Sequence, residues 1–193
     1  ILEHEVVEEF PWKNNMKPST DDNIEGVLRR TWRPALSIVG VDGMPSTADA
    51  GNVLRPYTTF QLSMRIPPTA DAKKATLAIE KALSKNVPYD ATVELKFEKA
   101  GEGWNAPETK TWLLKSIEKA SRNYFGEKSC FMGEGGSIPF MGMLGKQFPK
   151  AQFVITGVLG PKSNAHGPNE FLHIPFAKNL TCCISSIISD FKK

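Results

Sequence analysis

Apolar and polar residues alternate in two stretches of the chain, which is the spacing of β-strands with one buried face. Residues 59–66 carry Phe, Leu, Met and Ile on one side and mainly polar residues on the other. Residues 92–98 repeat this alternation, and residues 35–39 form a short apolar run that Gly40 ends. The pattern therefore predicts three strands.

Two further stretches show the spacing of helices. A short helix is predicted over residues 21–30, and residues 69–85 place an apolar residue at every fourth position behind Thr69, a candidate N-cap. Strand, strand, helix and strand in this order predict an α+β sandwich of the ferredoxin-like kind over residues 1–105.

The second half of the chain, residues 106–193, has a different pattern of helices alternating with apolar segments. Residues 151–156 are almost continuously apolar, as in a parallel strand buried on both faces. Three helices are predicted around this strand: one capped by Asn105 and opened by Pro107, one from Ser137 and Pro139 to Phe148, and one over 175–191. This half predicts an α/β layer with too few strands for a complete doubly wound domain.

Composition and charge narrow the class of protein. The chain has 193 residues, 40% of them hydrophobic, enough for one domain or two small ones. Its 24 Lys and Arg against 21 Asp and Glu give a net charge of +3, spread along the chain, which argues against nucleic-acid binding. No apolar run reaches the roughly 18 residues of a membrane span. Three cysteines without a disulfide pattern favour a reducing, cytoplasmic setting.

One candidate for metal chemistry is His166, among the small and polar residues 163–170. It follows a predicted strand and precedes a helix, which is where α/β sheets hold ligands. Its imidazole could ligate zinc, with Asn169 or Glu170 orienting the ring. A zinc site takes three or four ligands, and no second His or Cys cluster accompanies this one. A metal ligand and an ordinary loop histidine both fit the pattern.

A glycine-rich stretch, Gly133-Glu134-Gly135-Gly136-Ser137, precedes the helix predicted at Pro139. Backbone amides at a helix N-terminus can bind an anion such as a carboxylate, and Ser137 adds a hydroxyl donor. The phosphate-loop pattern is absent. A tight turn that only caps the helix fits equally well.

Two polar residues of the first half are further candidates for substrate binding. Arg65 lies on the polar side of a predicted strand, and its guanidinium could hold a carboxylate in bidentate fashion. Asn52 lies where the chain passes from a glycine-containing loop into the next segment. Its side-chain amide could donate a hydrogen bond to a developing oxyanion. A solvated arginine and a turn asparagine are the plainer interpretations.

Five sequence blocks, in this order along the chain, carry a resemblance to a known family: residues 33–37, 51–53, 62–65, 133–139 and 164–170. They resemble the zinc dipeptidases, a family that includes carnosinase and the cytosolic non-specific dipeptidase. Carboxypeptidase G, aminoacylase and succinyl-diaminopimelate desuccinylase are more distant members. The resemblance runs from about Arg30 to the end of the chain.

The resemblance implies a role for each candidate residue. His166 resembles the last ligand of a two-zinc site, in which manganese or cobalt are alternative metals. The other residues resemble positions that contact a dipeptide substrate, and Asn52 does so across a homodimer: Asn52, Arg65, Gly135, Gly136 and Ser137. Gly133 stands where the eukaryotic dipeptidases have Arg, which leaves the substrate preference open.

The resemblance also implies an architecture. Residues 1–105 correspond to a lid, or dimerisation, domain without its start, and residues 106–193 to the C-terminal part of the α/β catalytic domain. The other metal ligands and a general-base Glu lie upstream in such enzymes, and the chain opens with Ile1 rather than Met. We therefore expect a dipeptidase as the intact protein and no activity from this fragment. The alternatives are a deacylase or desuccinylase of N-acyl amino acids, a non-catalytic binding or dimerisation fragment, and, most weakly, a nucleic-acid module.

Overall fold

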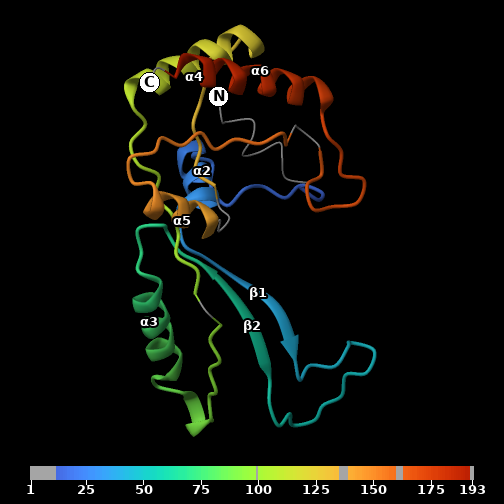
Figure 1. Ribbon diagram of the computed structural model, residues 1–193. Coiled ribbons are helices and arrows are strands. Elements are labelled where there is room, and N and C mark those ends of the chain that lie inside the picture. The colour runs from blue at the N-terminus through green and yellow to red at the C-terminus, as the bar shows by residue number, and fades with distance from the viewer. Residues whose placement is uncertain (1–11, 99, 135–138, 160–162, 192–193) are drawn as a thin grey trace. The chain divides into compact units, whose positions relative to one another are not determined.

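The computed structural model describes residues 12–98, 100–134, 139–159 and 163–191 (Figure 1). The internal contacts divide the chain into two compact units, built mainly from Leu28–Trp104 and from Asn105–Glu134 with Phe140–Lys193. Residues 12–27 group with the second of these. The boundary predicted between a lid domain of residues 1–105 and a catalytic part of residues 106–193 stays a prediction.

The unit built from Leu28–Trp104 contains an antiparallel hairpin of β1 (Ala35–Asp42) and β2 (Thr59–Arg65). Both strands were predicted, although β1 continues past Gly40. The helix α3 (Ala72–Ser84) and the 3₁₀ turn η1 (Pro88–Asp90) follow. The cap of α3 is not Thr69, as the sequence suggested, but Asp71, whose carboxylate accepts a 3.0 Å hydrogen bond from the amide of Lys74. Asp at this position also complements the helix dipole.

A β-bulge between Ile38 and Gly40 decides which side chains of the hairpin share a face. Directly opposed residues in a ladder lie on the same face, so the extra residue Val39 brings Val41 onto the face of Ile38. Three apolar pairs form this apolar ribbon face: Leu36 with Met64, Ile38 with Leu62, and Val41 with Phe60. Their exposed fractions range from 43% for Met64 to 65% for Ile38.

The predicted strand over residues 92–98 is wrong. These residues are irregular, and the sheet found in the described residues has two strands, β1 and β2. Alternation indicates which side chains share a face, but a strand also needs a neighbouring edge to complete its backbone hydrogen bonds. Val93 and Phe97, predicted to point inward, are 44% and 45% exposed. The ferredoxin-like arrangement of the first half is therefore not confirmed.

The other unit is organised by two helices that lie side by side, α4 (Thr111–Phe125) and α6 (Ile174–Asp190) (Figure 1). Between them lies a small core of Leu113, Ala120, Cys183 and Ile187. The helix α4 begins at Thr111 and not, as predicted, at Pro107 behind Asn105. Of the apolar residues that recur at helical spacing in this segment, Leu113 and Ala120 are buried, whereas Tyr124 is 39% exposed.

Two shorter helices, α2 (Asn23–Thr31) and α5 (Pro139–Gln147), agree with the predicted ones. The buried strand predicted at residues 151–156 is wrong, since this segment is irregular and Ile155 is 53% exposed. A parallel strand is stable only between neighbours, and the ladder of the described residues joins β1 to β2 alone. Across the described residues, no helix is both long enough and apolar enough to cross a membrane.

Candidate functional site

His166 lies in a compact loop that is closed by backbone hydrogen bonds. The amide of Phe171 donates to the carbonyl of Ser163 at 3.1 Å, and the amide of Gly167 donates to the carbonyl of Asn164 at 2.9 Å. Ser163, at the base of the loop, is only 2% exposed. The loop is therefore anchored at its base while His166 is exposed at its surface.

The backbone of the loop has an unusual conformation at three residues. His166 has a φ of +61°, and Asn164 and Asn169 have φ values of +55° and +58°. Asn and His are the residues that tolerate this left-handed region best after glycine. The side chain of Asn164 donates a 2.6 Å hydrogen bond to the carbonyl of Pro168. The loop thus holds His166 by bonds that do not use its imidazole.

Glu170, one of two candidates from the sequence for orienting the imidazole, contacts the backbone of His166. The amide of His166 donates to Oε2 of Glu170 at a long 3.4 Å. The proposed orientation of the ring by Asn169 or Glu170 therefore stays a prediction. Among the described residues, no group of three or more His, Cys, Asp and Glu side chains gathers in a way that could hold a metal ion. The imidazole of His166 fits one ligand of a zinc site, and the described donors do not fit a whole site.

The other histidine near this loop has a structural role. Nδ1 of His173 accepts a 3.1 Å hydrogen bond from the amide of Phe176, so His173 caps the N-terminus of α6. The helix predicted over residues 175–191 is thereby confirmed as α6, which begins directly after His173. His173 therefore offers a natural comparison for His166 in experiments.

Asn52 lies in the long connection between β1 and β2, at the centre of a tight turn. The amide of Val53 donates to the carbonyl of Gly51 at 2.9 Å, which closes a three-residue turn around Asn52. The base of the same connection is tied by Arg55, whose Nη1 donates to the carbonyl of Gly43 at 3.0 Å. Asn52 is exposed at this turn.

Arg65 is the last residue of β2 and pairs with Ala35 at the start of β1. It is exposed on the face opposite to the apolar ribbon face. Asn52 and Arg65 belong to one compact unit and His166 to the other. Gly135, Gly136 and Ser137 lie outside the described residues.

Sequence reasoning missed one residue with strong polar contacts, Glu118 of α4. Its Oε2 accepts hydrogen bonds from the amide of Ser129 at 3.0 Å and from Oγ of Ser129 at 2.8 Å. Its Oε1 accepts a 2.7 Å hydrogen bond from Nε of Arg122. These donors, those of Ser129 first, lower the pKa of Glu118. The four-residue spacing to Arg122 signals an ion pair, but nothing in the sequence signals Ser129.

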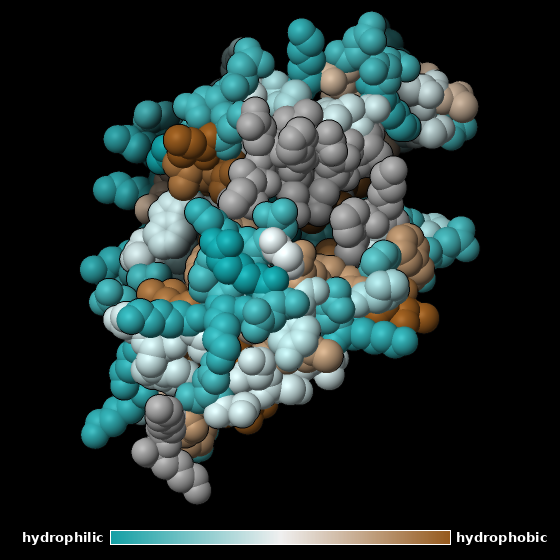
Figure 2. Space-filling view, turned by 90° about the horizontal axis from the view of Figure 1, so that it is seen from above, coloured by the Kyte–Doolittle hydropathy of each residue, from teal (hydrophilic) through white to brown (hydrophobic). Residues whose placement is uncertain are grey.

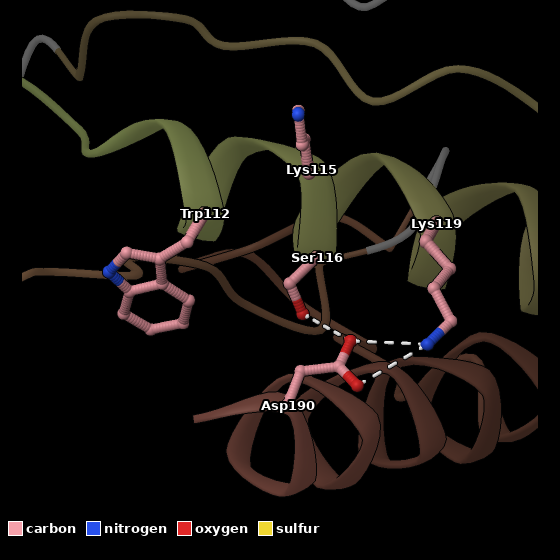
Figure 3. A pocket seen from close by; sticks show the side chains of 5 residues that line it. All are labelled: Trp112, Lys115, Ser116, Lys119 and Asp190. Atoms are coloured by element: carbon pink, nitrogen blue, oxygen red, sulfur yellow. Dashed lines mark hydrogen bonds and ion pairs between the residues drawn. The ribbon is translucent and has the colours of Figure 1, made fainter. Parts of the chain in front are cut away.

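A cleft lies along α4 and α6, lined by Trp112, Lys115, Ser116, Lys119 and Asp190 (Figure 3). Three of its polar side chains bind one another, because Asp190 accepts from both Ser116 and Lys119. Figure 2 shows that apolar side chains reach the surface in separate places among hydrophilic ones. On α6, Ile188 is 68% exposed.

Comparison with known proteins first shows which class of protein this chain resembles in its fold. No protein-family model matches the chain. The fold is similar to that of the M20 family metallo-carboxypeptidase Sso-CP2 of Sulfolobus solfataricus, with a TM-score of 0.70 and 15% identity over 96% of this chain and 44% of that one. Human carnosine dipeptidase 1 gives a TM-score of 0.62 at 16% identity, over 96% of this chain and 41% of that one. The fold is therefore that of part of an M20-type metallopeptidase.

The sequence comparison gives a narrower group of similar proteins, the dipeptidases. The cysteinylglycine-S-conjugate dipeptidase of Corynebacterium striatum is 29% identical over 153 residues, 76% of this chain and 33% of the relative. The Cys-Gly metallodipeptidase DUG1 of Saccharomyces cerevisiae is 32% identical over 142 residues, 69% of this chain and 28% of the relative. The structure of the yeast protein matches with a TM-score of 0.63 at 23% identity, over 89% of this chain and 36% of that one.

These comparisons confirm the resemblance to the dipeptidase family. The chain is a relative of the metallodipeptidases and spans about a third of the length of the curated relatives that it matches.

Proposed function

We propose that this chain is part of a metallodipeptidase that hydrolyses the peptide bond of dipeptides. The observation that carries the proposal is the sequence similarity to two named dipeptidases, 29% identity over 153 residues and 32% over 142 residues. The resemblance of the glycine-rich and histidine blocks supports the same activity.

We assign the metal to zinc and give His166 the role of one ligand. In such a site zinc polarises the scissile carbonyl and lowers the pKa of a bound water. The exposed position of His166 on an anchored loop supports this role, because the ring is held at the surface without being used to close the loop. The remaining ligands and the general-base Glu belong to polypeptide beyond this chain.

We assign the recognition of substrate to Arg65, Asn52 and the glycine-rich stretch. A dipeptide carries a free carboxylate, which the guanidinium of Arg65 can hold through two parallel hydrogen bonds. The amides of Gly135 and Gly136 and the hydroxyl of Ser137 suit the same anion. The amide of Asn52, displayed on its tight turn, is assigned to a substrate bound in the partner subunit.

We propose that this chain alone has no dipeptidase activity, because it spans about a third of the length of the curated relatives that it matches.

We propose a homodimer formed through the unit that carries β1 and β2. The six side chains of the apolar ribbon face are each 43–65% exposed, and such contiguous apolar faces mark interaction surfaces. Replacement of Leu62 by Asp should shift the sedimentation coefficient from that of a dimer to that of a monomer. Replacement of Ser63, its neighbour on the opposite face, by Asp is the matched control. A monomeric unmodified protein would refute the dimer.

The free cysteines Cys130, Cys182 and Cys183 support a cytoplasmic location.

The activity is tested with a panel of dipeptides and N-acetyl amino acids and the complete protein. Zinc, manganese and cobalt are added separately after treatment with a chelator. Metal-dependent release of amino acids from dipeptides supports the proposal. Faster turnover of the N-acetyl substrates would establish the alternative, a deacylase or desuccinylase. Zinc-dependent turnover by this chain alone would refute the proposed inactivity of the fragment.

A further inference from the structure

Another cavity adjoins the loop of residues 163–171 that carries His166. Four apolar side chains and one carboxylate line this cavity, the Glu170 pocket: Val158, Leu159, Glu170, Phe171 and Leu172. Its volume is about 330 Å³. Sites for whole small molecules measure about 300–1,000 Å³, so this pocket suits a small ligand or one part of a larger one.

The backbone holds one wall of the Glu170 pocket in place. The amide of Phe171 donates to the carbonyl of Ser163 at 3.1 Å, and Ser163 is only 2% exposed. Leu172 is followed directly by His173, which caps α6. The wall is therefore anchored on both sides, and a ligand would not have to order it.

The apolar lining of the pocket is open to solvent in this chain. The exposed fractions of its four apolar residues lie between 42% for Val158 and 61% for Leu159. The carboxylate of Glu170 accepts one long hydrogen bond, at 3.4 Å from the amide of His166, and has further acceptor positions. An apolar hollow with a carboxylate in its lining complements a ligand that joins an apolar group to a cation.

The chemistry of a dipeptide determines which of its parts lies beside His166. The scissile carbonyl belongs to the N-terminal residue, so a metal that polarises this carbonyl has the N-terminal side chain and the free ammonium group close by. The hydrogen bond between the amide of His166 and Oε2 of Glu170 connects the proposed metal ligand to the pocket. The dipeptide's own carboxylate lies on the other side of the scissile bond.

We propose that the Glu170 pocket binds the N-terminal residue of the substrate, with its side chain on the four apolar residues and its ammonium group at Glu170. This proposal rests on the proposed dipeptidase function and adds a substrate preference to it. The preferred dipeptides have an apolar N-terminal side chain and a free amino group.

The side-chain preference is tested in the complete enzyme through kcat/KM for Leu-Gly and Gly-Gly. We expect Leu-Gly to be preferred by about tenfold or more, since each methylene group in an apolar pocket changes this ratio by about tenfold or more. Val158→Phe, which fills the pocket, should remove most of the preference. Ile188→Phe is the matched control and should keep it, because Ile188 is an exposed apolar residue of the same compact unit that does not line the pocket.

Leu172→Ala enlarges the pocket instead of filling it and should shift the preference from Leu-Gly towards the bulkier Phe-Gly. If another part of the polypeptide covers the pocket, neither Val158→Phe nor Leu172→Ala changes the ratios between these substrates. Unchanged ratios in both variants would overturn the proposal.

A second measurement needs no catalysis. The complete protein, depleted of metal, is titrated with leucinamide, and the methyl NMR signals of Val158, Leu159 and Leu172 are followed. We expect these signals to shift, and isocaproamide, which is leucinamide without its amino group, to bind about threefold or more weakly. Glu170→Gln should remove this difference while it keeps a side-chain oxygen for the amide of His166. An undiminished difference in Glu170→Gln would overturn the role of its charge.

The two measurements separate this proposal from the proposed function. Methyl signals that stay unchanged, in a protein that cleaves dipeptides, would overturn the proposal alone. A complete protein that cleaves no dipeptide, but whose methyl signals respond to leucinamide as expected, would refute the proposed function and leave the pocket as a site for an apolar group beside an ammonium.

Discussion

The carboxylate of Asp190 accepts a 2.9 Å hydrogen bond from the hydroxyl of Ser116, which fastens the last residue of α6 to the middle of α4 (Figure 3). An acidic residue at a helix C-terminus is unfavourable for the helix dipole. The hydrogen bond from Ser116 and the ammonium of Lys119 offset this charge. Lys119 contacts both oxygens of Asp190 at 3.3 Å. Ser116 is 4% exposed, so its hydroxyl depends on this partner.

Ser116→Ala should therefore lower the free energy of unfolding by about 1 kcal/mol, the usual effect of one lost hydrogen bond. Asp190→Ala should lower it more, because it leaves the buried hydroxyl of Ser116 without an acceptor. Lys115→Ala is the control, since Lys115 lines the same cleft but points away from Asp190 (Figure 3). Urea denaturation measures these differences. Equal effects of Ser116→Ala and Lys115→Ala would contradict this assignment.

The three cysteines should differ in reactivity. Cys183 is 6% exposed, and burial, followed by the neighbouring Cys182, raises the pKa of its thiol. Cys130 and Cys182 are exposed. Because the thiolate is the reactive form, a thiol reagent at neutral pH should modify Cys130 and Cys182 quickly and Cys183 only slowly. Cys183→Ala should remove the slow phase alone. Three equal rates in the folded protein would contradict the packing of α4 on α6.

The histidine loop should be sensitive to a methyl group at Gly167. A Cβ there would lie 2.6 Å from Nδ2 and 2.7 Å from Oδ1 of Asn164. The Asn164 side chain would have to leave the carbonyl of Pro168, so we expect Gly167→Ala to cost about 1 kcal/mol. Gly142→Ala, where a Cβ meets no atom within 4 Å, is the control. Faster amide exchange in residues 163–171 would report the opening of the loop, and unchanged exchange would contradict the predicted clash.

The contact between Glu118 and Ser129 should depend on pH. The pKa of Glu118 lies below its ordinary value of 4.5, chiefly through the hydrogen bonds from Ser129. The contact therefore contributes fully to stability above the ordinary pKa and is lost as the pH falls through the lowered one. Carbon NMR should show Glu118 titrating below 4.5 and moving upwards in Ser129→Ala. A titration of Glu118 that is unchanged in Ser129→Ala would contradict the assigned cause.

The helices could be predicted from the sequence because their signals are local. The spacing of Leu180, Ile184 and Ile187 is enough to predict α6. The two wrong strands, residues 92–98 and 151–156, depend on neighbours distant in sequence, which an apolar pattern does not identify. The bulge at Val39 escaped prediction for the same reason, since it is defined only by the register against β2.

The candidate site could be predicted only as far as its residues carry a family resemblance. His166 was found by its small and polar neighbours, but the bonds that close its loop join residues up to eight positions apart and leave no periodic signal. Glu118 was missed because Ser129, eleven residues further on, reaches it only after the turn at Gly126.

The most direct test of the proposed function compares two histidines in the complete protein. We predict that His166→Ala abolishes metal-dependent hydrolysis of dipeptides and reduces the bound zinc measured by elemental analysis. We predict that His173→Asn, which preserves the cap of α6, retains both. Undiminished zinc content and dipeptide hydrolysis in His166→Ala would contradict the assignment of His166 as a metal ligand, and with it the proposed part of this chain in the metal site.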